Sequence, residues 1–284
     1  MIKVLKSGLS SSIQDLGRLE YRDFGVPHSG AMDMKSMETA NLLLGNSLND
    51  AVLEMTMIGA TLQFLVSTSI VISGADMSPE LNGKLILSNR VILVNSGDVL
   101  SFSTVASGFF TYLAVYGGFK TEMVLNSRSF YDDITKKSRI QDGDILKISE
   151  FSSLFYTNNT NSKIKSYDFT ISELDVFKGP EFDMLVKENQ NKLLTSEFKV
   201  SKFYNRMAYQ LESKIQNNLK SILTSPVLPG TVQLTPSGQL IVLMRDCQTT
   251  GGYPRVLQFS EKAINLLAQK KERDKVKFNL IEFP

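Results

Sequence analysis

A succession of short apolar runs, each followed by turn residues, constrains the fold of this chain most. The runs alternate apolar with polar positions and are rich in β-branched side chains, and turns such as Asn82-Gly83 separate them. Short alternating runs with regular turn signals are typical of an all-β sandwich or barrel. We therefore predict a mostly β protein of two β-rich halves with few short helices. The runs are residues 61–66, 70–72, 84–87, 91–94, 99–102 and 110–116.

A weak internal repeat accompanies these runs. Residues 97–102 (Gly-Asp-Val-Leu-Ser-Phe) resemble residues 143–148 (Gly-Asp-Ile-Leu-Lys-Ile), and residues 273–278 echo both without the glycine. Each segment places an aspartate before an alternating strand. The repeat is either a common way of entering a hairpin or a sign that related β units close each half of the molecule.

Three helices are expected. Asp33 can cap a helix that continues to Leu44, and Gly45-Asn46 then ends it. Apolar spacing indicates a second helix between residues 182 and 193, and Ser260 can cap a third.

A polar stretch divides the chain. Residues 152–166 are short of large apolar side chains, which is typical of a linker. We place one β-rich half at residues 1–150, the other at residues 169–284, and a polar linker or exposed loop at residues 151–168.

Composition excludes several classes of function. The 31 basic and 29 acidic residues leave a formal charge of +2, so neither nucleic acid nor an anionic membrane is predicted as a partner. Cys247 and His28 are the only residues of their kinds, which excludes an intramolecular disulfide, a cysteine-based zinc site and a multi-histidine metal site. The N-terminus lacks the apolar stretch of a signal peptide, and no uncharged apolar run reaches the roughly 18 residues of a membrane span. We expect a cytoplasmic protein.

The first dense polar segment covers residues 13–33. Glycines and a proline fix a tight path from which Arg18, His28, Ser29 and Asp33 project. Arginine binds planar oxygens, and histidine exchanges protons near neutral pH, so such a loop can orient a carboxylate or an amide. The alternative is a structural loop whose polar groups satisfy its own backbone.

A nucleophilic pair of His28 and Cys247 is conceivable in principle. Nothing in the sequence places the two together, and a single cysteine is more often a small buried side chain.

The second polar segment, residues 246–254, follows a predicted strand at residues 239–244. Gln248 and Thr249 precede Gly251, Gly252 and Tyr253. Hydroxyls and exposed glycine N–H groups at a strand end suit an oxyanion or a carbonyl oxygen. The alternative is a glycine turn that joins two strands.

Two arginines are further candidates. Arg206 lies between aromatic and thioether side chains in residues 204–211, and Arg128 lies in the segment 126–129. Either could hold an anion, although a surface arginine in a strand is the commoner case. The phosphate-binding G-x-x-x-x-G-K-[ST] loop and the G-x-S-x-G nucleophile turn are both missing.

Together these segments resemble the allophanate hydrolase subunit 2 family, which includes the 5-oxoprolinase subunit designated C and the distal half of biotin-dependent urea carboxyltransferases. The matching stretches spread over nearly the whole chain, from residue 13 to residue 269. They are residues 13–18, 25–33, 40–46, 53–54, 127–129, 205–207, 229–233 and 246–254.

The resemblance implies a cyclophilin-like β-barrel architecture for the half at residues 169–284. It also implies a partner related to allophanate hydrolase subunit 1 (KipI-like), with either a LamB/YcsF-type subunit or a biotin carboxylase and its carrier. The implied reaction is ATP-dependent hydrolysis of 5-oxoproline to glutamate, or carboxyl transfer from carboxybiotin to urea. The cofactor would be ATP in the assembled complex or carboxybiotin on a partner, with none bound covalently. A third possibility is a non-catalytic protein that binds and neutralises a KipI-like kinase inhibitor, as one bacterial family member does.

For the enzyme, we expect the polar segments to border a shared cleft. The expected catalytic residues are His28, Asp33, Gln248 and Thr249; the expected substrate-binding residues are Arg18, Ser29, Arg128, Arg206, Gly251, Gly252 and Tyr253; and no metal ligand is expected. Asn205 and Gln210 stand where the family tends to have an acid and a base. This exchange leaves open whether the substrate is altered or catalysis is weakened.

Overall fold

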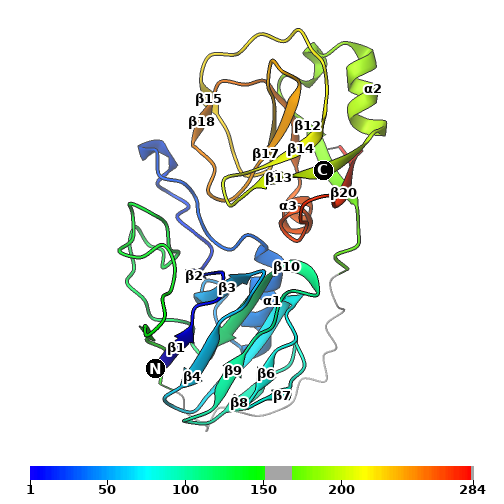
Figure 1. The fold of residues 1–284 in the computed structure, drawn as a ribbon. Coiled ribbons are helices and arrows are strands. Elements are labelled where there is room, and N and C mark those ends of the chain that lie inside the picture. The colour runs from blue at the N-terminus through cyan, green and yellow to red at the C-terminus, as the bar shows by residue number, and fades with distance from the viewer. Residues whose placement is uncertain (151–167, 283–284) are drawn as a thin grey trace. The chain divides into compact units, whose positions relative to one another are not determined.

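The computed structural model describes residues 1–150 and 168–282. The chain divides into two compact units (Figure 1). Unit 1 comprises Met1–Gly17 and Met34–Asp168, and unit 2 comprises Arg18–Asp33 and Phe169–Pro284. All but the last residue of the predicted linker at 151–168 lies outside the described residues.

Unit 1 is built from two sheets. The six-stranded sheet has the order β11 (Ile145–Leu146), β1 (Ile2–Lys6), β4 (Thr61–Phe64), β9 (Val99–Ser101), β6 (Glu80–Leu81) and β7 (Lys84–Leu85). The five-stranded sheet has the order β2 (Ser10–Gln14), β3 (Val52–Thr56), β10 (Ser107–Val115), β5 (Thr68–Asp76) and β8 (Ile92–Val94).

Both sheets of unit 1 contribute to one apolar core. Alternate residues of β1 and β4, such as Ile2 and Leu62, pack with alternate residues of the five-stranded sheet, such as Leu53, Ile72 and Leu113. The period of two in these strands directs one side of each sheet toward the core. Helix α1 (Met34–Leu44) packs on β5 and β10.

The end of α1 follows from its last residues. Gly45 has a positive φ of 71°, its N–H donates to the carbonyl of Leu42 (3.1 Å), and the N–H of Asn46 donates to the carbonyl of Asn41 (2.9 Å). These two bonds form a Schellman motif, which glycine favours because it adopts the left-handed conformation without strain.

Unit 2 contains a closed barrel of seven strands. Their order is β12 (Glu173–Lys178), β19 (Arg255–Phe259), β16 (Thr231–Leu234), β17 (Gln239–Leu243), β14 (Ala208–Lys214), β13 (Glu197–Tyr204) and β20 (Lys275–Leu280). A parallel pair of β12 with β20 closes the ring. Buried aromatic rings fill part of the interior: Phe278 stacks on Phe198 at 5.0 Å and meets Phe259 edge-on at 5.6 Å.

Short elements complete unit 2. They are the 3-10 helices η1 (Arg22–Phe24) and η3 (Phe182–Met184), the helices α2 (Lys187–Thr195) and α3 (Glu261–Ala268), and a two-stranded sheet of β15 (Ser225–Pro226) with β18 (Thr250–Gly251). Ser260 caps α3 as predicted, because its side chain accepts the N–H of Ala263 at 3.1 Å.

The prediction of a mostly β protein with few short helices is confirmed. Two details differ. The first unit is a pair of packed sheets, and the closed barrel belongs to the second unit. In addition, residues 18–33 belong to unit 2 although they precede α1 in the chain, whereas the expectation placed them in the half at residues 1–150.

The internal repeat corresponds to one recurring turn. In each copy the aspartate N–H donates to the carbonyl of the residue three positions earlier, and the aspartate Oδ2 accepts that residue's N–H at 2.8–2.9 Å. The third position has a positive φ, taken by Gly97, Gly143 and Arg273. The turns are residues 95–98, 141–144 and 271–274. Two copies lie in unit 1 and one in unit 2, so the repeat is a shared strand entry.

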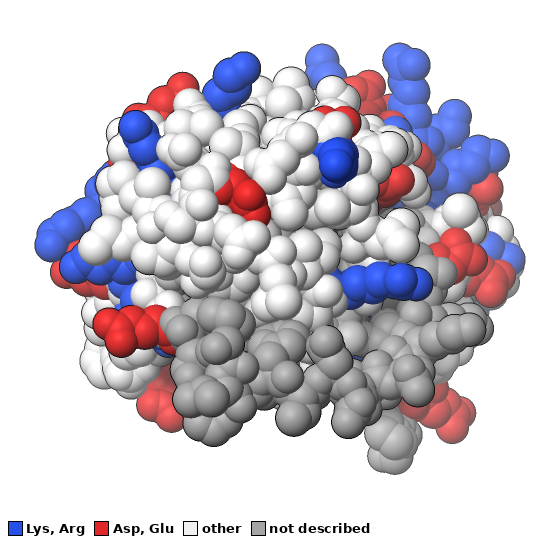
Figure 2. All heavy atoms as spheres, turned by 90° about the horizontal axis from the view of Figure 1, so that it is seen from below, with Lys and Arg blue, Asp and Glu red and all other residues white. Residues whose placement is uncertain are grey.

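Charges of both signs are distributed over the surface. On the face drawn in Figure 2, Lys and Arg side chains are interspersed with Asp and Glu around a largely uncharged area. None of the helices in the described part of the chain is long and apolar enough to cross a membrane.

Candidate functional site

Residues 18–33 are held to the barrel unit by hydrogen bonds along their length. The N–H of Arg18 donates to the carbonyl of His28 (2.6 Å), which closes the first part of the segment into a loop. Further on, the N–H of Ser29 donates to the carbonyl of Arg245 (3.1 Å), and the Gln269 amide donates to the Asp33 carboxylate (2.8 Å). The segment is therefore an integral part of unit 2.

Arg206 links this segment to the loop after β17. Its guanidinium makes a bidentate pair with Asp246, through Nε to Oδ2 at 2.7 Å and Nη2 to Oδ1 at 3.0 Å. Nη2 also donates to the carbonyl of Gly30 at 2.6 Å. Bidentate arginine–carboxylate pairs fix geometry as well as contributing energy. In this structure Arg206 thus joins the two polar segments that the sequence analysis singled out.

Arg245 makes a second, more buried connection. Its guanidinium pairs with Glu261 at the start of α3 and bonds Asn265 Oδ1 (3.1 Å), while Nε donates to the carbonyl of Met32 (3.4 Å). The side chain of Arg245 is only 4% exposed. The first turn of α3 is thereby tied to the end of the 18–33 segment.

A small flap covers part of the outer barrel face. We define the flap as residues 222–228 and 248–252, which include the paired strands β15 and β18. The N–H of Val227 donates to the carbonyl of Thr249 (3.1 Å), and the N–H of Ile222 donates to the carbonyl of Gly252 (3.0 Å). Arg22 Nη2 donates to the carbonyls of Val227 and Gln248, so η1 is fastened to the flap as well.

Under the flap lies a small apolar cluster. It is formed by Val227, Leu243 and Cys247, with Ala208 and Ile241 packed against it. Burial raises the pKa of the Cys247 thiol, and the neighbouring Arg22 charge only partly opposes this effect. A fully buried thiol with a raised pKa is a poor nucleophile. The structure therefore gives no support to a Cys247 nucleophile.

Gln233 of β16 also lies under the flap. It is 2% exposed, and its Nε2 is buried without a hydrogen-bond partner among the described residues. A Cβ built on Gly251 would lie 2.3 Å from this Nε2 and 3.3 Å from Val227 Cγ1. Gly251 does not have a positive φ, so the close approach of the flap backbone to Gln233 is what requires glycine there.

Gly252 is under less steric constraint than Gly251. A Cβ on Gly252 would meet only the carbonyl oxygen of Ile222, at an ordinary 3.6 Å. Close packing therefore accounts for glycine at position 251 but not at position 252.

Ser29 occupies a strained position at the centre of the 18–33 segment. It is fully buried, has a positive φ of 59°, and its Oγ has no hydrogen-bond partner within the described ranges. A non-glycine residue in this conformation costs about 1–3 kcal/mol, and such residues cluster at functional sites. This observation supports the functional interpretation of the segment.

Arg128 lies apart from the other candidates because it belongs to unit 1. Its guanidinium donates to the carbonyl of Thr121, and its N–H donates to Asp15 Oδ2 (2.6 Å). Asp15 also accepts the hydroxyls of Ser127 (2.6 Å) and Ser129 (2.7 Å). Asp15 of the first matching stretch thus forms a hydrogen-bonded junction with residues 127–129 inside unit 1.

The structure assigns the remaining predicted residues to unit 2. Arg206 bonds the 18–33 segment at Gly30, and Gln248 bonds it at Arg22, whereas Thr249, Gly251 and Gly252 make their contacts within unit 2 to Val227, Gln233 and Ile222. His28 is half-buried and Tyr253 is 40% exposed. The unit-2 residues expected from the sequence are Arg18, His28, Ser29, Asp33, Arg206, Gln248, Thr249, Gly251, Gly252 and Tyr253.

Sequence reasoning missed three residues of this neighbourhood. Arg22 and Asp246 lie within the polar segments and make the contacts that hold them, while Gln233 ends one of the matching stretches. Their polarity was visible, but only the pairing of β16 with β17 and β19 and the position of the flap bring Gln233 beneath Gly251.

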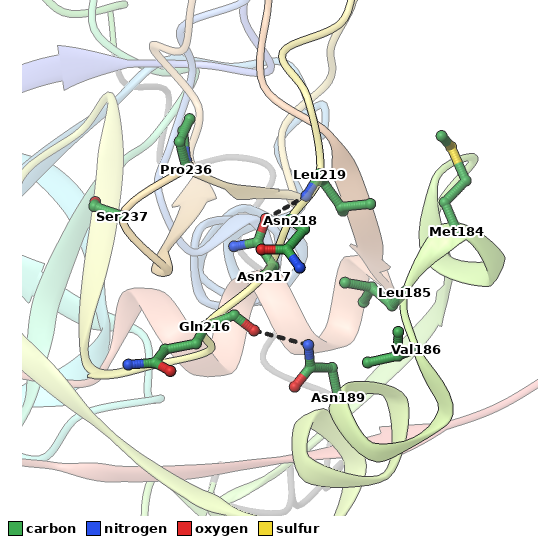
Figure 3. Close-up of a pocket in the computed structure, with 10 residues that line it drawn as sticks. All are labelled: Met184, Leu185, Val186, Asn189, Gln216, Asn217, Asn218, Leu219, Pro236 and Ser237. Carbon is green, nitrogen blue, oxygen red and sulfur yellow. Dashed lines mark hydrogen bonds between the residues drawn. The ribbon is translucent and has the colours of Figure 1, made fainter.

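A separate hollow of about 550 Å³ opens on unit 2 (Figure 3). It lies between the apolar residues Met184 and Val186 and the loop of residues 216–219, and it is lined by neutral side chains. Asn189 Nδ2 bridges its two walls by donating to the carbonyl of Gln216 at 2.7 Å, which is drawn as a dashed line. None of the predicted site residues lines it.

No group of three or more His, Cys, Asp or Glu side chains that could hold a metal ion is found in residues 1–150 and 168–282.

Comparison with known proteins identifies the family of this chain and several similar proteins. A family model described as "Carboxyltransferase domain, subdomain A and B" matches residues 24–280. The 5-oxoprolinase subunit designated C in Escherichia coli (strain K12) is 30% identical over 273 residues, which are 95% of this chain and 87% of that protein. The corresponding 5-oxoprolinase subunit of Haemophilus influenzae, also designated C, is 29% identical over 289 residues, covering 99% of this chain and 91% of that protein.

Among solved structures, the crystal structure of the Kluyveromyces lactis urea carboxylase matches with a TM-score of 0.89 and 25% sequence identity. The match covers 99% of this chain and 27% of that chain, so this chain spans about a quarter of the yeast protein's length.

Proposed function

Since the chain belongs to the family of carboxyltransferase domains with subdomains A and B, we propose that it is a subunit of a heteromeric, ATP-dependent 5-oxoprolinase. The resemblance to this family that the sequence motifs indicated is confirmed. The proposed reaction opens the lactam of 5-oxoproline to give glutamate.

One observation carries this proposal. Two proteins named as subunits of 5-oxoprolinase match almost end to end, with 87% and 91% of their own lengths covered. The urea carboxylase structure has the same fold within a chain nearly four times as long. Because these matches span most of two proteins that are themselves subunits, we propose that this chain acts as a subunit.

The flap gives this chain groups suited to a lactam. The Thr249 hydroxyl and the N–H groups of Gly251 and Gly252 are donors that can stabilise negative charge developing on a carbonyl oxygen. Gln248 is held by Arg22 through its carbonyl, so its side chain stays available. We assign carbonyl polarisation to Thr249 and these glycines, and orientation of the substrate to Gln248 and Tyr253.

The 18–33 segment would supply the remaining groups. We assign proton transfer or orientation to His28 or Asp33, and carboxylate binding to Arg18 and Ser29. Arg206 was expected to bind an anion, but the contacts described above occupy its Nε and Nη2. We therefore assign Arg206 a holding role in which it keeps Gly30 against Asp246.

ATP would activate the lactam by phosphorylation, and we assign its binding to the assembled complex. The arginines around the flap do not fit a triphosphate site, because each is already engaged. Arg206 pairs with Asp246, Arg245 with Glu261 and Arg255 with Glu181, while Arg22 donates to two carbonyls. We derive no step through ATP on this chain.

The partners proposed are a subunit-1-like (KipI-like) protein and a LamB/YcsF-type subunit, in the cytoplasm. The names of the two bacterial relatives, which are both subunits, support an assembly with other chains.

A second candidate is a biotin-dependent carboxyltransferase that acts on urea or a related small amide. The urea carboxylase match over 99% of this chain favours it. In that case a biotin carboxylase and carrier would be the partners, and carboxybiotin on the carrier would enter the same site.

The third candidate is a non-catalytic antagonist of a KipI-like inhibitor, and the presence of Asn205 and Gln210 in place of the family's acid and base gives it some weight. In the structure Asn205 Oδ1 accepts the N–H groups of Met207 (2.8 Å) and Ala208 (3.1 Å). An aspartate carboxylate makes the same turn bonds. Asn205 therefore preserves the turn that presents Arg206, and this substitution does not favour loss of catalysis.

Reconstitution distinguishes the three candidates. The purified chain is combined with its partner subunits and given either 5-oxoproline with ATP, or urea with ATP, bicarbonate, biotin carboxylase and carrier. Glutamate formed in the first mixture supports the oxoprolinase. Turnover that needs biotin carrier and bicarbonate supports carboxyl transfer, and tight pairing without turnover in either mixture supports the antagonist.

A further inference from the structure

Gln233 is an unusual residue to find under the flap. It lies on the outer face of β16, and its barrel neighbours across the ladder are Ile241 and Arg255. The flap covers it through Gly251 and Val227, next to the apolar cluster around Cys247. A polar amide is thus enclosed at the edge of a small apolar core.

Within residues 1–150 and 168–282, no acceptor bonds the Nε2 of Gln233 in this closed arrangement. Burying a donor without an acceptor is unfavourable, and native proteins contain few such groups. Gln258, on the neighbouring strand β19, shows the usual outcome: its Nε2 donates to the carbonyl of Pro229 (2.8 Å) and its Oε1 accepts the Thr231 hydroxyl (2.8 Å). Gln233 therefore retains a donor that the fold itself does not use.

Several features indicate that the flap can move away from Gln233, whereas Gln233 itself is held in the barrel. The register between β16 and β19 shifts at Gln233, and such irregularities re-aim side chains next to active sites. The flap strands β15 and β18 have only two residues each and are partly exposed. Few buried contacts and exposed backbone bonds favour local opening.

We propose that Gln233 contacts the substrate: when the flap lifts, its Nε2–H group donates to a carbonyl or carboxylate oxygen of a small amide or lactam. The proposal rests on the proposed function. It adds one donor, Gln233 Nε2, to the donors of the 248–252 loop that lies above it. Gly251 has no side chain, so the flap backbone can close directly over the Gln233 side-chain amide.

The test separates this role from a structural one by comparing stability with activity. Gln233→Met has a similar shape and removes the donor. Because the donor has no partner in the closed protein, the variant should unfold at a midpoint about 2–4 °C higher than the wild type. In the assembled complex its kcat/KM should nevertheless fall at least tenfold. The matched control, Gln258→Met, removes satisfied bonds and should lower the unfolding midpoint.

Three results would overturn the proposal. A lower unfolding midpoint for Gln233→Met would mean that Nε2 has an internal partner, such as a bound water. A raised midpoint with kcat/KM within twofold of the wild type would mean that the donor does not touch substrate. If the wild-type complex turns over neither 5-oxoproline nor urea, the proposed function fails but the contact is still testable. The contact is then tested by the rise in unfolding midpoint that 2-pyrrolidinone, 5-oxoproline or urea causes in the wild type. An equal rise in Gln233→Met, or no rise in either protein, would exclude the contact.

Discussion

At the scale of single residues, we assign Thr249 two roles that belong to different atoms: its backbone carbonyl is structural, and its side-chain hydroxyl is chemical. Its carbonyl accepts the N–H of Val227 and so helps to hold the flap, whereas its half-buried side chain takes no part in the described hydrogen bonds. A substitution that changes only the hydroxyl can therefore separate the two roles.

Thr249→Val keeps the shape of the side chain and removes the donor. We expect the variant to fold and to pair with its partners, because the backbone bond to Val227 is retained. Loss of one donor to a developing oxyanion costs about 100- to 1,000-fold in kcat, measured as glutamate release by the assembled complex. Near-normal turnover would show that Thr249 is not a catalytic donor, and failure to fold would show that the loop is structural.

Glu181 makes an extensive ion pair with Arg255. Its carboxylate accepts the Arg255 side chain through Nε (3.0 Å) and Nη2 (2.9 Å), and also the Arg255 N–H (2.8 Å). These bonds to Arg255 hold the pKa of Glu181 below its usual range. A depressed carboxyl pKa stabilises the folded protein above the unfolded pKa, and this stabilisation is lost as pH falls through the folded pKa.

Glu181→Gln should therefore lower the free energy of unfolding at pH 7 by about 2–3 kcal/mol. The difference from the wild type should shrink below a pH of about 4.5, where the wild-type carboxyl itself begins to be protonated. Urea unfolding at pH 7 and pH 3.5 measures both values, with Glu212→Gln on an exposed part of β14 as the control. A difference that does not depend on pH would contradict this assignment.

At the scale of elements, the recurring turn shows what the sequence could and could not predict. The three aspartates before alternating strands were visible as a repeat. In the structure each one accepts the N–H of the residue three positions before it. Arg273 stands where the other two copies have glycine, yet it adopts the same left-handed conformation. The aspartate bonds and the following strand impose the turn, so the missing glycine did not mean a missing turn.

Replacing Arg273 by glycine tests this conclusion. An arginine at φ 71° is strained, whereas glycine is not, although glycine loses more backbone entropy on folding. We expect Arg273→Gly to raise the free energy of unfolding by about 0.5–1 kcal/mol. Arg273→Ala removes the same charge but keeps a Cβ, so it should not stabilise. Equal effects of the two variants on urea unfolding would mean that charge, rather than conformation, matters at this position.

Strand alternation, Ser260 and Gly45-Asn46 were enough to predict a mostly β fold and two of its helix ends, because these signals act within a few residues. Assignment of residues 18–33 to unit 2 depends on Ser29, Gly30 and Asp33 bonding to residues more than 170 positions away. No local pattern encodes such contacts. The same limit hid Gln233, whose role arises only from the flap that covers it.

At the scale of the whole chain, residues 18–33 form part of unit 2, although the residues on both sides of them in sequence belong to unit 1. Arg206 is the residue that best tests this, because it joins Gly30 to Asp246 and its own side chain is only 23% exposed. Arg206→Gln should lower the free energy of unfolding by about 3–5 kcal/mol, since it leaves Asp246 buried without its partner.

The same variant should also expose residues 18–33 to proteolysis, which mass spectrometry of the fragments can locate. Exposed Lys202→Gln, on the neighbouring strand β13, provides the control. Normal stability with a raised KM alone would contradict the holding role and return Arg206 to the anion-binding role expected from the sequence.

The central claim is that this carboxyltransferase-domain chain completes a 5-oxoprolinase. The most direct measurement is the rate at which the partner subunits form glutamate from 5-oxoproline and ATP, with and without this chain. We predict that glutamate appears only when the chain is present, with about one ADP formed for each glutamate. An equal rate without the chain, or turnover that requires urea, bicarbonate and a biotin carrier instead, would contradict the account.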